Sequence, residues 1–134
     1  MKQELKPQAY SSIYWLIEDG KIDPEQLFVF FELYWPTFIK KDGYVFLKEQ
    51  FSEEEYENSK DNPEFWINFL TVDDYFIDAE NSAELSKNFS KTLVEIWKAK
   101  LEKDFPSIEF TVEYLEDEEA GDYGLTFYQT KHLS

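Results

Sequence analysis

The stretch SAELSKNFSKTLVEIWKAKLEKDF, residues Ser82–Phe105, carries the clearest pattern in the chain. Its apolar residues recur every four positions, which places them on one face of an α-helix, while lysines and glutamates occupy the other face. Asn81 and Glu84 form a variant of the capping box, and Pro106 is typical of a helix end. We therefore predict one long helix whose apolar stripe packs into the core. The stripe consists of Leu85, Phe89, Leu93, Trp97, Leu101 and Phe105.

Two more helices are predicted near the start of the sequence. Pro7 suits the first turn of a helix, and apolar residues follow it at helical spacing, so we predict a helix over about residues 7–18. Asp23 and Pro24 mark a second helix start, and Pro36 ends that helix. Its sequence, LFVFFELYW, is apolar on nearly every side, which predicts a deeply buried helix.

Strand signals occur both before and after the long helix. Asp42-Gly43 lies between two β-prone runs and predicts a tight hairpin. Apolar and polar residues alternate over 108–114 and again over 125–130, on either side of an acidic loop, which predicts a second hairpin. Two β-hairpins that form an antiparallel sheet, together with several helices, predict a single α+β domain over residues 1–134. The long helix is expected to pack on one face of that sheet.

The segment between the first hairpin and the long helix contains two short helix signals. Ser52 and Glu55 form a capping-box pattern that opens a short acidic helix. Asn62 and Pro63 mark another helix start, followed by aromatic residues at helical spacing. The stretch 71–77 fits a loop, a short strand or a helical turn, and the sequence does not choose among them.

Acidic residues dominate the charge of the chain. The 29 aspartates and glutamates against 13 basic residues, all of them lysines, give a net charge of −16. Nucleic acids and anionic membranes are bound through clustered cations, so we expect neither as a partner. A basic protein, by contrast, would be attracted to such a surface and oriented by it.

The location of the protein is predicted from three features that the sequence lacks. No apolar run approaches the roughly 18 residues that cross a bilayer. The stretch MKQELKPQAY has no apolar centre of the kind that signal peptides carry, and the chain contains no cysteine. We therefore expect a cytoplasmic protein.

Motifs for catalysis or metal binding are weak. The four glycines form no phosphate-binding loop, and His132, the only histidine, is expected to be a solvated tail residue. The acids of 73–80 could serve acid–base chemistry, but with 29 acidic residues such clusters arise by chance. The acidic loop Glu116–Asp122 lacks the spacing of a calcium-binding loop. We predict no enzyme, no cofactor and no metal site.

Aromatic residues make up 19% of the sequence and allow two interpretations. The tryptophans and two phenylalanines are expected in the core, although some could instead line a pocket or anchor an interface. Five tyrosines are better candidates for the surface. The expected core set is Trp15, Trp35, Trp66, Phe69, Trp97 and Phe105, and the expected surface set is Tyr44, Tyr56, Tyr75, Tyr123 and Tyr128.

These observations favour a non-enzymatic, acidic protein-binding domain, of the immunity or inhibitor type, for a basic partner. The alternatives are a generic acidic domain whose charge only maintains solubility, and a small-ligand-binding or enzymatic domain with an aromatic-lined pocket. The contact surface is expected to be acidic and to carry an exposed tyrosine. The predicted contact residues are Glu53, Glu54, Glu55, Tyr56 and Glu57, followed by Glu116, Asp117, Glu118 and Glu119.

Overall fold

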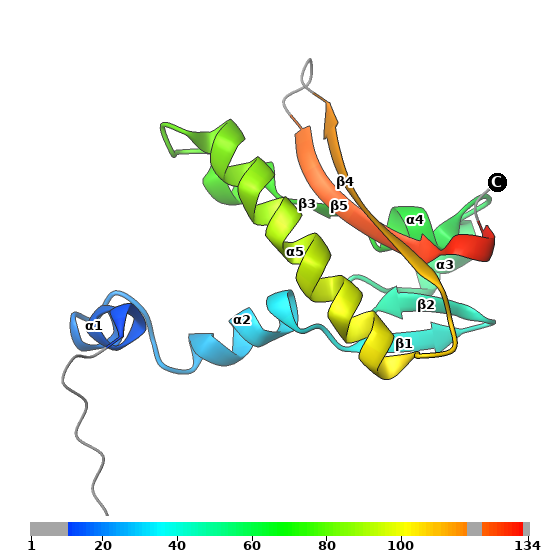
Figure 1. The fold of residues 1–134 in the computed structure, drawn as a ribbon, viewed down its shortest axis with the longest axis horizontal. Helices are drawn as coiled ribbons and strands as arrows, with labels where there is room; N and C mark the ends of the chain where they lie inside the picture. Colours follow the sequence, from blue (N-terminus) through cyan, green and yellow to red (C-terminus); the bar gives the residue numbers. More distant parts are fainter. Residues whose placement is uncertain (1–10, 118–121, 133–134) are drawn as a thin grey trace, which may run out of the picture. The chain divides into compact units, whose positions relative to one another are not determined.

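The computed structural model describes residues 11–117 and 122–132, which form five α-helices, two 3-10 helices and five β-strands (Figure 1). This composition confirms the predicted α+β class. The chain divides into two units, Met1–Phe31 and Glu32–Ser134, and each is described by itself.

The first unit contains α1 (Ser12–Glu18) and most of α2 (Gln26–Tyr34). The N-terminal end of α1 is capped by Ser11, whose hydroxyl accepts a hydrogen bond from the Tyr14 amide at 3.2 Å. Gly20 follows with a positive φ of 71°, which is the conformation that ends many helices. The part of the predicted first helix before Ser11 lies outside the described residues.

The predicted burial of α2 is wrong. None of its residues is buried, and the side chains of Phe28 and Val29 are 70% and 65% exposed. The start signal was interpreted correctly, because Asp23 and Gln26 exchange hydrogen bonds ahead of the helix. Local capping is enough to begin a helix, but burial requires a packed neighbour, which an apolar sequence does not supply by itself.

The second unit is built around α5 (Ser82–Asp104), which packs along β4 (Phe110–Asp117) and β5 (Asp122–Gln129) (Figure 1). Leu93, Trp97 and Leu101 are almost completely buried, so the centre of the predicted stripe is core. The stripe is less buried toward its ends, and Leu85 is 40% exposed. Asn81 precedes the helix without a side-chain capping bond, so the predicted capping box is absent there.

The two predicted hairpins are both present, but they belong to two sheets. β1 (Phe38–Lys41) and β2 (Tyr44–Leu47) form a two-stranded sheet, and Asp42 and Gly43 between them both have positive φ, as a type I′ turn requires. The other sheet has the order β3-β5-β4, with the short strand β3 (Leu70–Thr71) on the edge of β5. All pairs are antiparallel.

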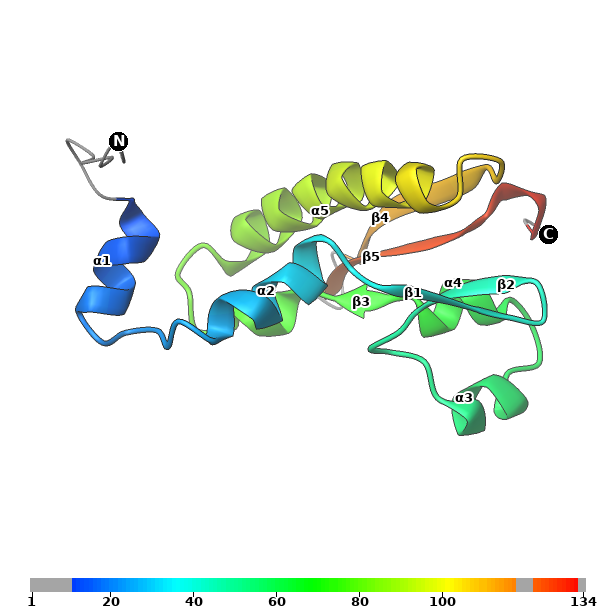
Figure 2. The same cartoon turned by 90° about the horizontal axis from the view of Figure 1, so that it is seen from below.

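The remaining elements are α3 (Glu53–Asn58), α4 (Pro63–Ile67) and the 3-10 helices η1 (Asp73–Phe76) and η2 (Thr130–His132). Helix α4 packs on β5, α3 packs on α4, and η1 packs mainly on α5. Figure 2 shows α5 on one side of β5 and α4 on the other. Because helices cover both of its faces, β5 is buried at every position from Gly124 to Gln129 instead of at alternate positions.

Among the described residues, no helix combines the length and the apolar character that crossing a membrane requires.

Candidate functional site

The short helix α4 joins the two sheets through a buried carboxylate. The Glu64 side chain is only 1% exposed and lies between the edges of β2 and β5. Its Oε2 accepts a hydrogen bond from the Val45 amide at 2.8 Å, and its Oε1 accepts one from the Gln129 amide at 3.0 Å. The Gln129 side chain donates a further bond to Oε2 at 2.7 Å. These donors make Glu64 a polar bridge in place of a direct strand pair.

Asn68, one helical turn after Glu64, continues this bridge. It is completely buried, and its Oδ1 accepts a bond from the Leu47 amide at 2.8 Å. Its Nδ2 donates to the carbonyl oxygens of Val45 at 3.0 Å and Phe127 at 3.2 Å. The strand β3 ends its pairing with β5 at Leu125, so these groups of β5 would otherwise lack partners.

A cavity of about 460 Å³ opens beside this bridge. Its wall is formed by the beginning of α4 and by single residues from β2, β4, β5 and η2. The lining therefore combines aromatic rings with two carboxylates. The lining residues are Tyr44, Asn62, Pro63, Glu64, Phe65, Glu113, Tyr128 and His132.

His132 does not behave as the solvated tail residue that the sequence suggested. Its Nδ1 lies 2.7 Å from Glu64 Oε1, and its ring packs against Tyr44 with the ring centres 5.0 Å apart. Because a carboxylate can only accept, Nδ1 carries the proton in this hydrogen bond when Glu64 is ionised. The 3-10 helix η2 places the histidine there by turning the chain back toward α4 directly after β5.

A second carboxylate in the cavity is held by a tyrosine. The Tyr128 hydroxyl donates a hydrogen bond to Glu113 Oε1 at 2.8 Å. Burial, together with this hydrogen bond, raises the pKa of Tyr128 to about 12. Tyr128 therefore stays protonated at neutral pH and remains a donor to Glu113. Tyr128 was expected at the surface, but only 7% of it is exposed.

The chemistry that this arrangement permits is limited. A histidine oriented by a buried carboxylate can accept or release a proton. Among the described residues that line the cavity, none is a serine, threonine, lysine or cysteine, so the nucleophiles beside the histidine are carboxylates and tyrosine hydroxyls. The described residues also contain no group of three His, Asp or Glu side chains that could hold a metal ion.

The predicted contact residues on α3 form an exposed acidic surface. Glu53, Glu54, Glu55 and Glu57 are all exposed, and Glu53 lies 3.4 Å from the Lys41 ammonium. The helix begins as predicted, because the Ser52 hydroxyl accepts a bond from the Glu55 amide at 3.1 Å.

Tyr56 has an intramolecular role. Its hydroxyl donates to Asp42 Oδ2 at 2.8 Å, and its ring packs against Tyr44, Phe46 and Phe51. The hydrogen bond to Asp42 is the main reason that the pKa of Tyr56 rises to about 12. The side chain is half-buried and fastens α3 to the first hairpin, and its contact with a partner stays a prediction.

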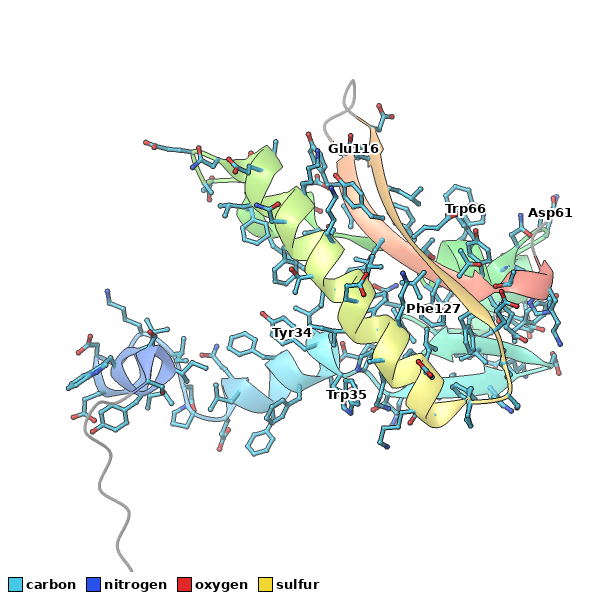
Figure 3. The ribbon with its side chains drawn as sticks, in the orientation of Figure 1. Tyr34, Trp35, Asp61, Trp66, Glu116 and Phe127 are labelled. Atoms are coloured by element: carbon cyan, nitrogen blue, oxygen red, sulfur yellow. The ribbon has the colours of Figure 1, made fainter. Side chains whose placement is uncertain are left out.

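An open groove of about 850 Å³ runs between α3 and α4, and two of the predicted acids, Glu54 and Glu55, line it. On the α4 side the groove is lined by Trp66, whose side chain is 65% exposed. Figure 3 shows Trp66 and Asp61 on the α4 side of the unit. We call this surface the α3–α4 groove. Its lining residues are Ser52, Glu54, Glu55, Asn58, Ser59, Lys60, Asp61, Trp66 and Ile67.

The second set of predicted contact residues lies elsewhere. Glu116 and Asp117 are at the end of β4, apart from the α3–α4 groove, as the label of Glu116 in Figure 3 shows. Glu116 lies 3.9 Å from the Lys87 ammonium. Glu118 and Glu119 lie outside the described residues. The structure therefore does not bring the two predicted sets together into one surface.

The four tryptophans, all predicted to lie in the core, differ in how far they are buried. Trp97 is core, as predicted, with 1% of its surface exposed. The core prediction is wrong for Trp15, Trp35 and Trp66, which are 49%, 42% and 65% exposed. Hydrophobicity alone does not distinguish these residues, because burial depends on which helix face meets a neighbour.

Three features of the site were not predicted from the sequence: the bridge of Glu64 and Asn68, the position of His132 and the exposure of Trp66. One signal for the bridge was present. Two polar residues, Glu64 and Asn68, stand four positions apart in EFWINFL, so both fall on one helical face, at the start and just after the end of α4. No signal pointed to His132, because its partner is 68 residues away in the chain.

Comparisons with known proteins identify no relative of the chain. No family model matches the chain, and no curated protein or solved structure is significantly similar to it.

Proposed function

We propose that this protein is a non-enzymatic, acidic protein-binding domain, of the immunity or inhibitor type, whose partner is a basic protein. We further propose that the partner contacts the α3–α4 groove. The observation that carries the proposal is the exposed indole of Trp66 beside the carboxylates of Glu54, Glu55 and Asp61. The lack of cysteine favours a cytoplasmic location for this binding.

The exposure of Trp66 supports a role in binding. Tryptophan offers the largest apolar surface of any side chain, and exposed tryptophan is enriched among the residues that dominate protein–protein affinity. The buried face of α4 holds Glu64, Ile67 and Asn68, so Trp66 is turned outward by the requirements of the bridge. A partner that covered the indole would remove this apolar surface from water.

The charge around Trp66 supports a basic partner. Two glutamates of α3 and Asp61 line the groove, and Lys60 is its only basic lining residue among those described. Within a chain of net charge −16, this surface would attract a cationic protein and repel an anionic one. Attraction of this kind weakens as added salt shortens the screening length, which is about 8 Å at physiological ionic strength.

The test is affinity capture from the native host at low salt, followed by kinetics with the purified partner. Trp66→Ala should lower affinity at least about tenfold, mainly through a faster off-rate. Neutralising three acids of α3 should instead slow association several-fold at low salt and have less effect at high salt. The replacement residue is glutamine and not lysine, because negative charge stabilises the first turn of α3 and positive charge there would weaken the helix. The neutralised residues are Glu53, Glu54 and Glu55.

A matched control separates a local effect from net charge. Changing three exposed acids on α5 and ahead of β4 to glutamine gives the same net charge of −13, since −16 + 3 = −13. The control variant should associate with the partner distinctly faster than the triple variant of α3 does. The proposal fails if no basic protein is captured, or if the two triple variants and Trp66→Ala all bind the captured protein like the wild type. The control residues are Glu95, Glu102 and Glu109.

The cavity beside α4 favours a second candidate function, the binding of a small ligand. It is lined by aromatic rings and by several polar groups, which are the usual features of a ligand pocket.

A further inference from the structure

We propose that the cavity beside α4 is a cation site, which receives the guanidinium or ammonium group of one side chain of the basic partner. The assignment of that side chain to a basic partner rests on the function proposed above. The cation site itself rests on the composition and geometry of the cavity.

The walls of the cavity suit a cation. Tyr44, Phe65 and Tyr128 present aromatic rings to it, and the faces of such rings attract positive charge. The volume of about 460 Å³ lies within the range of about 300–1,000 Å³ that ligand pockets occupy. A flat guanidinium or a compact ammonium could therefore enter together with part of its aliphatic stem.

The carboxylates of the cavity decide the sign of the ligand charge. Glu64 already accepts from two backbone amides, from Gln129 and from His132, so it contributes negative potential and no open acceptor. Among the described contacts of the Glu113 side chain, only Tyr128 hydrogen-bonds to it, through Oε1. Glu113 Oε2 is therefore the acceptor that a bound cation would meet.

An anion is disfavoured at the same place. Two carboxylates line the cavity, and none of the described lining residues is a lysine. The protein also contains no arginine, so bidentate recognition of phosphate or carboxylate is impossible.

The cavity is adjacent to the α3–α4 groove. Asn62 and Pro63 line the cavity, whereas Lys60 and Asp61, immediately before them, line the groove. On α4, the Phe65 ring belongs to the cavity and contacts the Trp66 ring of the groove, with the ring centres 4.8 Å apart. A partner that covers Trp66 is thus positioned to place a long basic side chain in the cavity.

The test uses the full chain and capped amino acids as probes. N-acetyl-arginine methylamide and N-acetyl-lysine methylamide are titrated at pH 8, where histidine is ordinarily neutral, while chemical shifts of the cavity residues are followed by NMR. We expect saturable binding with Kd of about 1–10 mM, which is a reasonable range for one side chain. The neutral analogues, N-acetyl-citrulline methylamide and N-acetyl-norleucine methylamide, should bind at least about tenfold more weakly.

Two variants locate the binding. Glu113→Gln should weaken the arginine and lysine probes about tenfold, because it removes the acceptor charge in the cavity. Glu109→Gln makes the same change of net charge at an exposed position outside the cavity lining and should alter affinity less than about twofold. Thermal melts of both variants establish that each is folded under the conditions of the titration.

Several outcomes would overturn the inference. Equal affinity for arginine and citrulline probes would show that charge plays no part. Equal losses of affinity in Glu113→Gln and Glu109→Gln would show that the probes respond to the net charge of the protein and not to the cavity. Tighter binding of free tetramethylammonium than of either capped amino acid would indicate a small cation, and not a partner side chain, as the ligand.

The inference and the proposed function can fail separately. If a basic partner is captured through Trp66 but no cationic probe binds, only the cation site is wrong. If the probes bind as expected but no basic partner is captured, the cation site stands and the source of its ligand is wrong.

Discussion

Helices α5 and α4 lie on opposite faces of β5 and distribute their side chains in opposite ways. On α5, the apolar residues Leu93, Trp97 and Leu101 are buried. Three of its lysines, Lys91, Lys98 and Lys103, are exposed. On α4 and the residue that follows it, the polar Glu64 and Asn68 are buried, while Trp66 is exposed. The apolar face of α5 forms the core of the second unit. The inner face of α4 instead replaces missing strand–strand hydrogen bonds, and its outer face carries the exposed Trp66.

This contrast has a simple physical cause. Each face of a sheet can bury apolar surface, and α5 satisfies that requirement for Leu125 and Phe127. The edges of β2 and β5 need donors and acceptors instead, because an unpaired backbone group in the interior is costly. A helix that lies along those edges must turn its polar residues inward, and its large apolar residues are left outside.

The largest expected effect concerns α5. Trp97→Ala should lower the free energy of unfolding by about 3–5 kcal/mol, because it leaves a cavity in the core. The variant also loses the hydrogen bond from the indole to the Leu33 carbonyl, which is 2.9 Å long in the wild type. Urea unfolding followed by circular dichroism measures the change. An unchanged midpoint would mean that α5 does not form the core.

The next effect concerns the inner face of α4. Asn68→Ala should destabilise the protein by about 2–3 kcal/mol, since buried groups of β2 and β5 lose their partners. Asn88→Ala, at an exposed position of α5, is the matched control and should change stability by less than about 0.5 kcal/mol. If the two asparagine variants unfold at the same urea concentration, the bridge does not contribute to stability.

A smaller effect, which depends on pH, is expected at Tyr128. Its pKa is raised from 10.0 to about 12, so above pH 10 the unfolded chain releases the phenolic proton while the folded protein retains it. The stability that this group contributes is present below pH 10 and is lost as the pH rises through about 12. Tyr128→Phe should cost about 1 kcal/mol at neutral pH, where the hydrogen bond to Glu113 is lost.

The same variant tests the linkage to pH. Between pH 10 and 12, the free energy of unfolding should fall less steeply for Tyr128→Phe than for the wild type. Urea midpoints at several pH values measure both slopes. Parallel slopes would show that the Tyr128 proton is not held more tightly in the folded state.

The smallest effect on stability is expected at the outer face of α4. Trp66→Ala should change the free energy of unfolding by less than about 0.5 kcal/mol, because most of the side chain already faces water. Set beside Trp97→Ala, this variant compares the same substitution on the two helices. A loss of several kcal/mol at Trp66 would mean that the indole supports the fold, and it would remove the reason to assign it to a partner.

Local sequence patterns determined much of the architecture. The period of α5, the Asp42-Gly43 turn and the alternation in β4 predicted those elements, because each depends on residues close together in the chain. The capping box at Ser52 is of the same kind. The acidity that favours a basic partner is likewise a property of composition.

The tertiary structure alone decided which residues form the site and which faces of α2 and α4 are exposed. The Glu64 carboxylate meets Val45, Gln129 and His132, which are 19, 65 and 68 positions away in the chain. No local pattern encodes such distant pairs. The same holds for α2 and Trp66, whose apolar side chains were expected in the core but are exposed. Sequence periodicity selects a helix and its faces, but the sheet edges and neighbouring elements determine which face turns inward.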